Sequence, residues 1–316
     1  MWRRRAAGLV LLAAALASPA LADQLTTVGA SGGDKVSAPA YVGVLDLWPT
    51  INLYFGFRAA SGTDTANVAN VCLEIGGVDS VCNDIGLVNH QADGAALTAM
   101  GCVTTAGPTN TCTVKTWYDK SATGATCTQA VAADRWQVWM APATGIVAAA
   151  YAPGNVAVAN YVCSPGPAAP SGAAASTMIT GLWDSTAYCG GTNRVMIGSG
   201  ANTAGTQRSL SCSNSAGHYT VRSGSANITA TGVSTGGVDA VTTGYDGTNM
   251  NFNINGTTNA VAAALNTTST TLTIGNRATS PATIESFAGV LLELANAPDY
   301  DATKAANVVA NIGAFW

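Results

Sequence analysis

Short apolar stretches recur along the chain and are separated by glycine, asparagine and proline residues. In the second half these stretches follow one another at fairly regular spacing, a pattern typical of β-sandwiches. Residues 250–254 alternate between apolar and polar side chains and run into Asn255-Gly256, a pair that favours a two-residue hairpin turn. The strands predicted in this half cover residues 178–183, 194–198, 209–212, 219–222, 240–245, 250–254, 270–274 and 286–294.

The first half contains further strand patterns. Residues 41–59 form an apolar block that Pro49 interrupts, which predicts a turn followed by a strand ending at Arg58. A hairpin is predicted over residues 71–86 around Gly76-Gly77, because two strand-like runs flank this glycine pair.

Two segments have helical patterns. Residues 92–100 favour a helix that Asp93 caps, and residues 301–315 favour one that Asp301 caps. The second has apolar residues at helical spacing. We therefore expect an all-β sandwich with a short C-terminal helix. The apolar positions of that helix are Ala302, Ala305, Val308, Val309 and Ile312.

The composition excludes one class of function. Hydrophobic residues make up 48% of the chain and charged residues 9%, against about 25% charged residues in typical soluble domains. The net charge is −4, and no basic patch lies beyond the N-terminus, so we set nucleic-acid binding aside.

Residues 164–172 (SPGPAAPSG) form the only linker-like run. We interpret it as a surface loop, near residues 164–176, within one domain spanning residues 23–316; the alternative is a linker between two lobes.

The N-terminus has the pattern of a secretory signal. Arg3, Arg4 and Arg5 precede an apolar run, and Ala20-Leu21-Ala22 predicts cleavage before Asp23. The alternative is a membrane anchor, but the apolar run is short for a span of about 20 residues. We predict a signal peptide at residues 1–22 and a secreted protein, periplasmic or extracellular, without a membrane partner after cleavage.

Eight cysteines fit an oxidising compartment. Two local pairs are natural, Cys72 with Cys82 and Cys102 with Cys112. Pairs Cys127–Cys163 and Cys189–Cys212 would complete the set, although the sequence does not determine the connectivity. The alternative, a metal site, lacks support because the chain has no C-x-x-C pair, two histidines and no D-x-D-x-D-G run. We predict no metal and no cofactor.

Three segments carry a family resemblance: residues 45–49 (LDLWP), 83–86 (NDIG) and 112–121 (CTVKTWYDKS). They resemble the catalytic domain of fungal and bacterial α-L-arabinofuranosidase B, a concanavalin A-like (jelly-roll) sandwich. Residues 243–256 and 272–290 contain a pattern that many laminin-G-like and lectin-like domains share. The resemblance implies the fold and an arabinose-bearing polysaccharide or glycan as partner.

The reaction that the resemblance implies is retaining hydrolysis of terminal arabinofuranosyl groups. This reaction needs two carboxyls about 5–5.5 Å apart. Residues 205–212 match the family's nucleophile strand but contain no Asp or Glu, and Arg277 occupies the position matching the acid/base aspartate. The carboxyls that remain as catalytic candidates are Glu285, close to that turn, and Asp184, beside the cysteine-bearing loop.

Five residues are candidates for contact with substrate. Trp117 and Trp183 have rings that can stack on sugars, although such residues are more often part of a core. Asp119, Asn276 and Arg277 offer polar groups, but capping of a turn is the alternative for Asp119. For the catalytic candidate Glu285 the alternative is a solvated strand residue.

Three functions remain open from the sequence. A glycoside hydrolase with rearranged carboxyls predicts an Asp/Glu pair that converges in a cleft. A non-catalytic glycan-binding protein predicts a cleft with aromatic and amide side chains and no such pair. An extracellular structural protein predicts no cleft and a flat or edge-exposed face.

Overall fold

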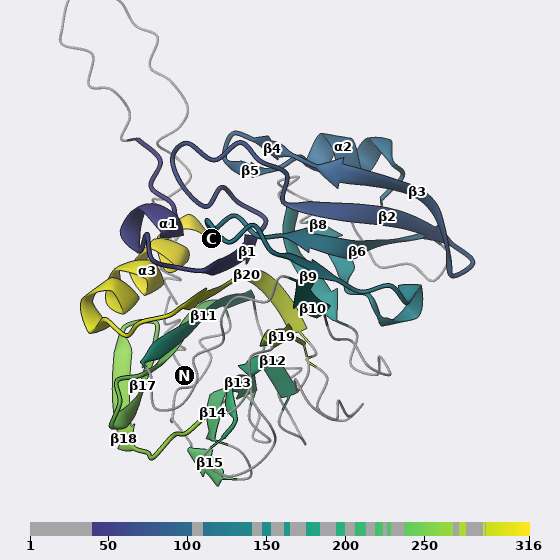
Figure 1. Ribbon diagram of the computed structural model, residues 1–316. Coiled ribbons are helices and arrows are strands. Elements are labelled where there is room, and N and C mark those ends of the chain that lie inside the picture. Colours follow the sequence, from purple (N-terminus) through teal and green to yellow (C-terminus); the bar gives the residue numbers. More distant parts are fainter. Residues whose placement is uncertain are drawn as a thin grey trace, which may run out of the picture.

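The computed structural model describes residues 40–102, 110–140, 147–152, 161–164, 175–183, 194–199, 206–212, 219–223, 226–228, 237–267, 272–275, 287 and 289–316. These residues form two antiparallel sheets that pack as a sandwich, with helices on the outside (Figure 1). The expected all-β sandwich is therefore confirmed. The predicted signal peptide and most of the linker-like run lie outside the described residues. No helix within the described ranges is long and apolar enough to cross a membrane.

The first sheet has the order β18–β17–β16–β11–β20. Two strands pair with different parts of the outer edge of β20. Strand β1 pairs with residues 293–296 and strand β9 pairs with residues 289–291. The strands are β1 (Leu53–Gly56), β9 (Val147–Ala152), β11 (Ser176–Trp183), β16 (Val238–Tyr245), β17 (Asn249–Ile254), β18 (Thr257–Ala262) and β20 (Gly289–Ala297).

The second sheet begins β3–β2–β6 and continues from β6 through β7, β10, β19, β12, β13 and β14 to β15. Strand β8 pairs with β9 and bridges to β6, and so connects the two sheets. The strands are β2 (Ala69–Ile75), β3 (Val78–Ile85), β6 (Asn110–Tyr118), β7 (Thr126–Thr128), β8 (Gln137–Met140), β10 (Tyr161–Ser164), β12 (Arg194–Ser199), β13 (Arg208–Cys212), β14 (Tyr219–Ser223), β15 (Ala226–Ile228) and β19 (Leu272–Ile274).

Helices cover the outer face of the first sheet. Helices α1 (Val44–Leu47) and α3 (Ala302–Phe315) lie together on one side of the molecule (Figure 1). Alternate strand residues face opposite ways, so Met178 and Leu294 join the core between the sheets while Ile179 and Ala295 pack among the helices. The remaining elements are α2 (Gly94–Ala99), a ribbon of β4 (Leu87–Val88) and β5 (Gln91–Ala92), and a 3₁₀ turn, η1 (Ala132–Asp134).

Both predicted helices are present, and their caps are confirmed. Asp93 accepts a hydrogen bond from the N–H of Ala96, and Asp301 accepts from the N–H groups of Thr303 and Lys304. The hairpin around Gly76-Gly77 is confirmed as β2 and β3. The 41–59 block differs, because it forms α1 before β1, and β1 ends at Gly56 rather than at Arg58.

The Asn255-Gly256 turn is also confirmed, and both residues have positive φ angles of 49° and 90°. These angles fit a type I′ turn, which asparagine and glycine tolerate best. The turn leads into β18, which was not predicted. All of its six residues are exposed, so the strand has no buried apolar face for a pattern to reveal.

Three of the four predicted disulfides are confirmed: Cys72–Cys82, Cys102–Cys112 and Cys127–Cys163. The first joins paired residues of β2 and β3, and the third joins paired residues of β7 and β10. Pairing of Cys189 with Cys212 stays a prediction, because Cys189 and the side chain of Cys212 lie outside the described part of the chain.

A buried ion pair holds α3 to the sheet. Arg58 and Glu293 of β20 are 0% and 1% exposed, and their Nη2 and Oε1 atoms are 2.9 Å apart. The Tyr54 hydroxyl and the Trp316 indole N–H each donate to Glu293 over 2.8 Å, and Arg58 donates to Asn311 of α3. The pair therefore links β1, β20 and the last two turns of α3.

Candidate functional site

Strand β17 presents asparagine side chains on the face of the sheet next to α3. Its sequence alternates, so Met250, Phe252 and Ile254 enter the core between the sheets. The intervening Asn251 and Asn253 point to the opposite face, because successive strand residues alternate in direction. They line a groove of about 410 Å³ between the strands and α3. We call this the asparagine groove; its lining is Thr242, Asn251, Phe252, Asn253, Thr258, Asn259, Ala260, Tyr300, Ala302 and Ala305.

Tyr300 forms one wall of the asparagine groove and lies against the backbone of Gly244 in β16. A Cβ atom at Gly244 would lie 2.2 Å from Cδ2 of the Tyr300 ring, so only glycine leaves room for the ring there. Gly244 is paired with Asn251 in the sheet, which brings the ring beside that amide. Burial raises the pKa of Tyr300, with smaller contributions from Asp246 and Asp301, so the hydroxyl stays protonated near neutral pH.

The orientation of the Asn251 amide is determined by Asp246. Asn251 Nδ2 donates to the Asp246 carboxylate over 2.9 Å and to the Asn249 carbonyl over 3.3 Å. Partial burial opposes ionisation of Asp246, but hydrogen bonds from Asn249, Asn251 and Thr248 outweigh it and lower the pKa to about 2. Because a carboxylate only accepts hydrogen bonds, the amide cannot turn over. Within the described part of the chain its Oδ1 accepts no hydrogen bond and is available to a ligand.

Asn253 is oriented the opposite way. Its Oδ1 accepts a hydrogen bond of 2.9 Å from the N–H of Gly256 in the following turn. The residue is 6% exposed and lines the groove. Its Nδ2 donates no hydrogen bond to any of the described residues. The asparagine groove thus offers a fixed acceptor at Asn251 and a fixed donor at Asn253, two residues apart on one face of β17.

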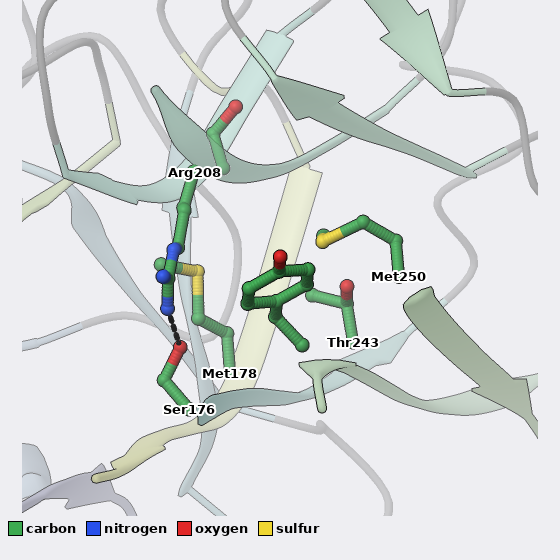
Figure 2. Close-up of a pocket in the computed structure, with 7 residues that line it drawn as sticks. Ser176, Met178, Arg208, Thr243 and Met250 are labelled. Atoms are coloured by element: carbon green, nitrogen blue, oxygen red, sulfur yellow. Dashed lines mark hydrogen bonds between the residues drawn. The ribbon is translucent and has the colours of Figure 1, made fainter. Parts of the chain in front are cut away.

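A second polar site, inside the sandwich, is too small for a sugar. Arg208 of β13 is 2% exposed and donates to Ser176 Oγ over 2.6 Å, with its guanidinium 5.0 Å from the centre of the Tyr245 ring (Figure 2). Burial lowers the pKa of Arg208 to about 10. The adjoining cavity has a volume of about 10 Å³, room for about one water molecule.

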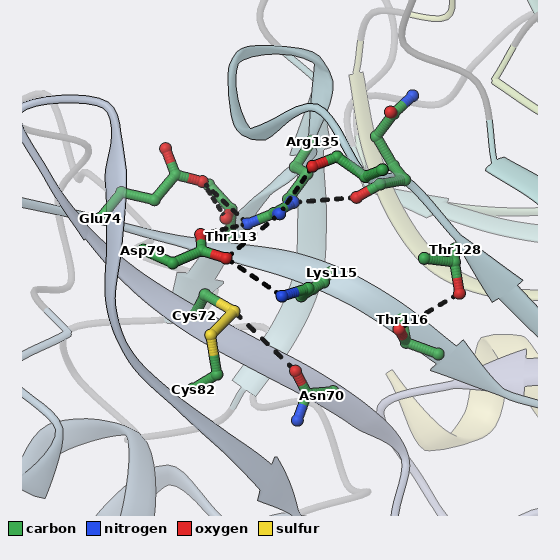
Figure 3. Close-up of polar contacts among 12 residues, drawn as sticks. Asn70, Cys72, Glu74, Asp79, Cys82, Thr113, Lys115, Thr116, Thr128 and Arg135 are labelled. Atoms are coloured by element: carbon green, nitrogen blue, oxygen red, sulfur yellow. Dashed lines mark hydrogen bonds and ion pairs between the residues drawn. A yellow bond between two sulfur atoms is a disulfide. The ribbon is translucent and has the colours of Figure 1, made fainter.

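A third polar cluster lies on β2, β3 and β6 (Figure 3). Arg135 contacts Asp79 through both terminal nitrogens, at 2.5 and 3.3 Å, and lies 3.6 Å from Glu74. Lys115 also contacts Asp79, over 3.1 Å. The hydrogen bond from Arg135 is the main cause of the lowered pKa of Asp79, which makes this carboxyl a poor proton donor near neutral pH.

Solved structures share this fold. An arabinofuranosidase complexed with arabinofuranosyl-α-1,2-xylobiose aligns with a TM-score of 0.57 at 14% identity, covering 86% of this chain and 65% of that chain. A GH54 α-L-arabinofuranosidase soaked with a cyclic sulfate inhibitor gives 0.57 at 15% identity with the same coverage. No family model matches the chain, and no curated protein does either.

These similarities confirm the fold that the sequence resemblance implied. The chain spans 65% of the length of those structures. At identities of 14–15% the likeness concerns the arrangement of the strands. The family resemblance matched residues 205–212 to the nucleophile strand. Of these, residues 206–212 are described, and Arg208 points into the sandwich.

Trp117 requires a correction, because it belongs to the core. Its side chain is 1% exposed and packs edge-on against Phe55, Phe57 and Tyr161 at centroid distances of 5.1 to 6.4 Å. No ring face remains open for a sugar. Trp136 is equally buried, at 0% exposure.

Asp119 organises a turn, which is the alternative that the sequence left open. Its Oδ1 accepts from the N–H groups of Tyr54 and Ser121, each over 2.8 Å. Its Oδ2 accepts from the Ser121 hydroxyl over 2.7 Å and from the N–H of Ala125 over 3.3 Å. Four hydrogen bonds occupy the carboxylate and connect the turn to β1, so Asp119 is corrected from a substrate contact to a structural residue.

The other predicted site residues are not tested by the structure. Asp184, Glu285, Asn276 and Arg277 lie outside the described residues, as does the side chain of Trp183. The asparagine groove was missed, although its signal was present. The run N-M-N-F-N-I-N at residues 249–255 places amides at every second position, and it was interpreted only as a strand.

Proposed function

We propose that this protein binds carbohydrate and that the asparagine groove is its binding site. The groove has the size of a small-ligand site, within the usual range of roughly 300–1,000 Å³. Its lining consists of amide, hydroxyl, methyl and aromatic groups and contains no charged side chain. Such groups suit a sugar, whose hydroxyls exchange hydrogen bonds with amides and whose ring packs against an aromatic face.

The single observation that carries this proposal is the opposite orientation of two neighbouring amides. Asn251 is held with its oxygen free by Asp246, and Asn253 is held with its nitrogen free by Gly256. A sugar hydroxyl both donates and accepts. Adjacent hydroxyls on one sugar therefore suit this pair without a rearrangement of either side chain.

Other features support the proposed cellular setting and the choice of sugars to test. The N-terminal signal pattern and the disulfides favour an exported protein that meets glycans in the periplasm or outside the cell. The fold likeness to arabinofuranosidases makes arabinose-bearing polysaccharides the first ligands to test.

Calorimetric titration with arabinan and arabinoxylan tests the proposal. Asn253→Ala removes the fixed donor and is expected to weaken binding about three- to tenfold, the equivalent of one hydrogen bond. The matched control is Asn83→Ala, because Asn83 is an exposed strand asparagine on β3, in the other sheet. Equal affinities for the two variants would reject the groove as the site.

Hydrolysis is the second candidate, and the fold likeness to GH54 α-L-arabinofuranosidases favours it. It requires a carboxyl pair, for which Asp184 and Glu285 remain the candidates. The test is turnover of 4-nitrophenyl α-L-arabinofuranoside by the wild type, Glu285→Gln and Asp184→Asn. The lining of the asparagine groove contains no carboxylate, so any turnover would come from a carboxyl pair outside this groove. Turnover that either substitution abolishes would establish an enzyme.

A further inference from the structure

A second groove follows the asparagine groove along the same helix and strand. It has a volume of about 370 Å³, and Val238 of β16 and Val309 of α3 contribute to its walls. We call it the apolar groove; its lining is Val238, Asn255, Gly256, Ala306, Val309, Ala310 and Gly313.

The two grooves are consecutive in both elements that form them. On α3 the lining passes from Ala302 and Ala305 to the segment from Ala306 to Gly313. On β17 it passes from Asn251 and Asn253 to the turn at Asn255. The distance from residue 302 to residue 313 along a helix is about 16 Å, and from residue 251 to residue 255 along a strand it is about 13 Å. Both lengths exceed one sugar ring.

The chemistry of the apolar groove complements that of the asparagine groove. The Asn255 amide is already occupied, because its Oδ1 accepts from the N–H of Ala240 and its Nδ2 donates to Asp239. The surface of the apolar groove therefore consists mainly of aliphatic side chains and glycine. Its lining offers no oriented amide to a sugar hydroxyl. Such a surface suits the C–H face of a sugar ring.

Charge defines the ligand further. Neither lining contains a lysine, arginine or histidine. Asp246 and Asp239 lie directly behind the amides of Asn251 and Asn255. Lys304 of α3 lies outside both linings and is 3.6 Å from Asp299 and 3.9 Å from Asp301. A uronic acid bound in either groove would have no cation to pair with its carboxylate. The carboxylates of Asp246 and Asp239 would in addition repel it.

We propose that the two grooves form one trough that binds several consecutive units of a neutral polysaccharide chain. The asparagine groove holds the hydroxyls of one unit and the apolar groove packs against the ring of a following unit. This inference rests on the proposed function, and it adds that the ligand is a chain rather than a single sugar and that it is uncharged.

Calorimetric titration with neutral arabino-, xylo- and gluco-oligosaccharides of one to five units tests the trough. For at least one series we expect the Kd to fall at least tenfold from one unit to three. Ala310→Phe fills the apolar groove from an exposed helix position and is expected to remove this gain while monosaccharide affinity stays unchanged. Ala314→Phe, also at an exposed position of α3 but outside the lining, is the control. Trigalacturonate should bind at least tenfold more weakly than the best neutral trisaccharide.

The possible failures are distinguishable. If one unit binds as tightly as three and Asn253→Ala still weakens binding, the trough is rejected and the proposed function stands. The same holds if Ala310→Phe and Ala314→Phe behave alike, or if trigalacturonate binds as well as the neutral chain. If no series binds, or if Asn253→Ala has no effect on any length, the proposed function fails and the trough fails with it.

Discussion

At the scale of the residue, the contact between Gly244 and Tyr300 controls the shape of the asparagine groove. The Tyr300 ring occupies the space in which any larger residue at position 244 would place its Cβ. The ring forms a wall of the groove and lies next to Asn251, so the absence of one side chain on β16 is a condition for the site.

We predict that Gly244→Ala displaces Tyr300 and weakens glycan binding at least threefold. Overpacking of this kind costs about 1–3 kcal/mol of stability, and urea unfolding measures it beside the titration. Gly237→Ala is the control, because nothing lies within 4 Å of a Cβ at Gly237. Unchanged affinity in Gly244→Ala would show that the ring is not part of the site.

A second prediction concerns the buried pair of Arg58 and Glu293. Burial disfavours the charged guanidinium, but Glu293 and two tyrosines outweigh it and raise the pKa of Arg58. Glu293→Gln leaves this charge without its counter-ion, which costs about 3–5 kcal/mol for a fully buried pair. Denaturant unfolding measures the loss. The control is Lys304→Met. Lys304 is 34% exposed and its partners Asp299 and Asp301 are 41% and 38% exposed, so the loss of these ion pairs should cost about 0–1 kcal/mol. Similar losses in the two variants would contradict the prediction.

At the scale of the element, the hairpin of β17 and β18 and the helix α3 together build the trough. The hairpin supplies the amides, the type I′ turn supplies the N–H that orients Asn253, and α3 supplies small side chains that leave the space open. The helix is held in place by its contacts with Glu293 and Arg58.

Disulfides stabilise elements of the second sheet to different degrees. Cys102–Cys112 closes a loop with a sequence separation of 10, and Cys127–Cys163 closes one with a separation of 36. By loop-closure entropy, replacing both cysteines of each pair with alanine should cost about 3 and about 4 kcal/mol respectively. Thermal unfolding of the two double variants measures the difference. A greater loss for the shorter loop would show that native packing rather than chain entropy dominates.

At the scale of the whole molecule, the local sequence pattern predicted the helices and strands but not which of their side chains contact one another. Alternation at residues 250–254 predicted β17, and Asn255-Gly256 predicted the turn. Which face of β17 meets α3 depends on packing between residues some fifty positions apart, as for Tyr300 on Gly244. For Trp117 the sequence left both a sugar contact and a core position open, and the fold encloses the ring.

A pH prediction for the whole molecule tests which titrating groups contribute to glycan binding. The lowered pKa of Asp246, about 2, keeps the carboxylate charged and Asn251 oriented at any pH above about 4, and the raised pKa of Tyr300 keeps its hydroxyl protonated. Glycan affinity should therefore stay constant from about pH 4 to about pH 8. Titrations across this range measure it, and an affinity that changes more than about threefold between pH 4 and pH 8 would show that another titrating group contributes to the site.

The most direct measurement is a nitrogen–proton NMR titration that follows the side-chain amides of the asparagines as a neutral oligosaccharide binds. We predict that the Nδ2 resonances of Asn251 and Asn253 shift in a saturable way, while that of Asn83 on β3 does not. Saturable binding that leaves both groove amides unmoved and shifts resonances elsewhere would contradict the assignment of the site to β17 and α3.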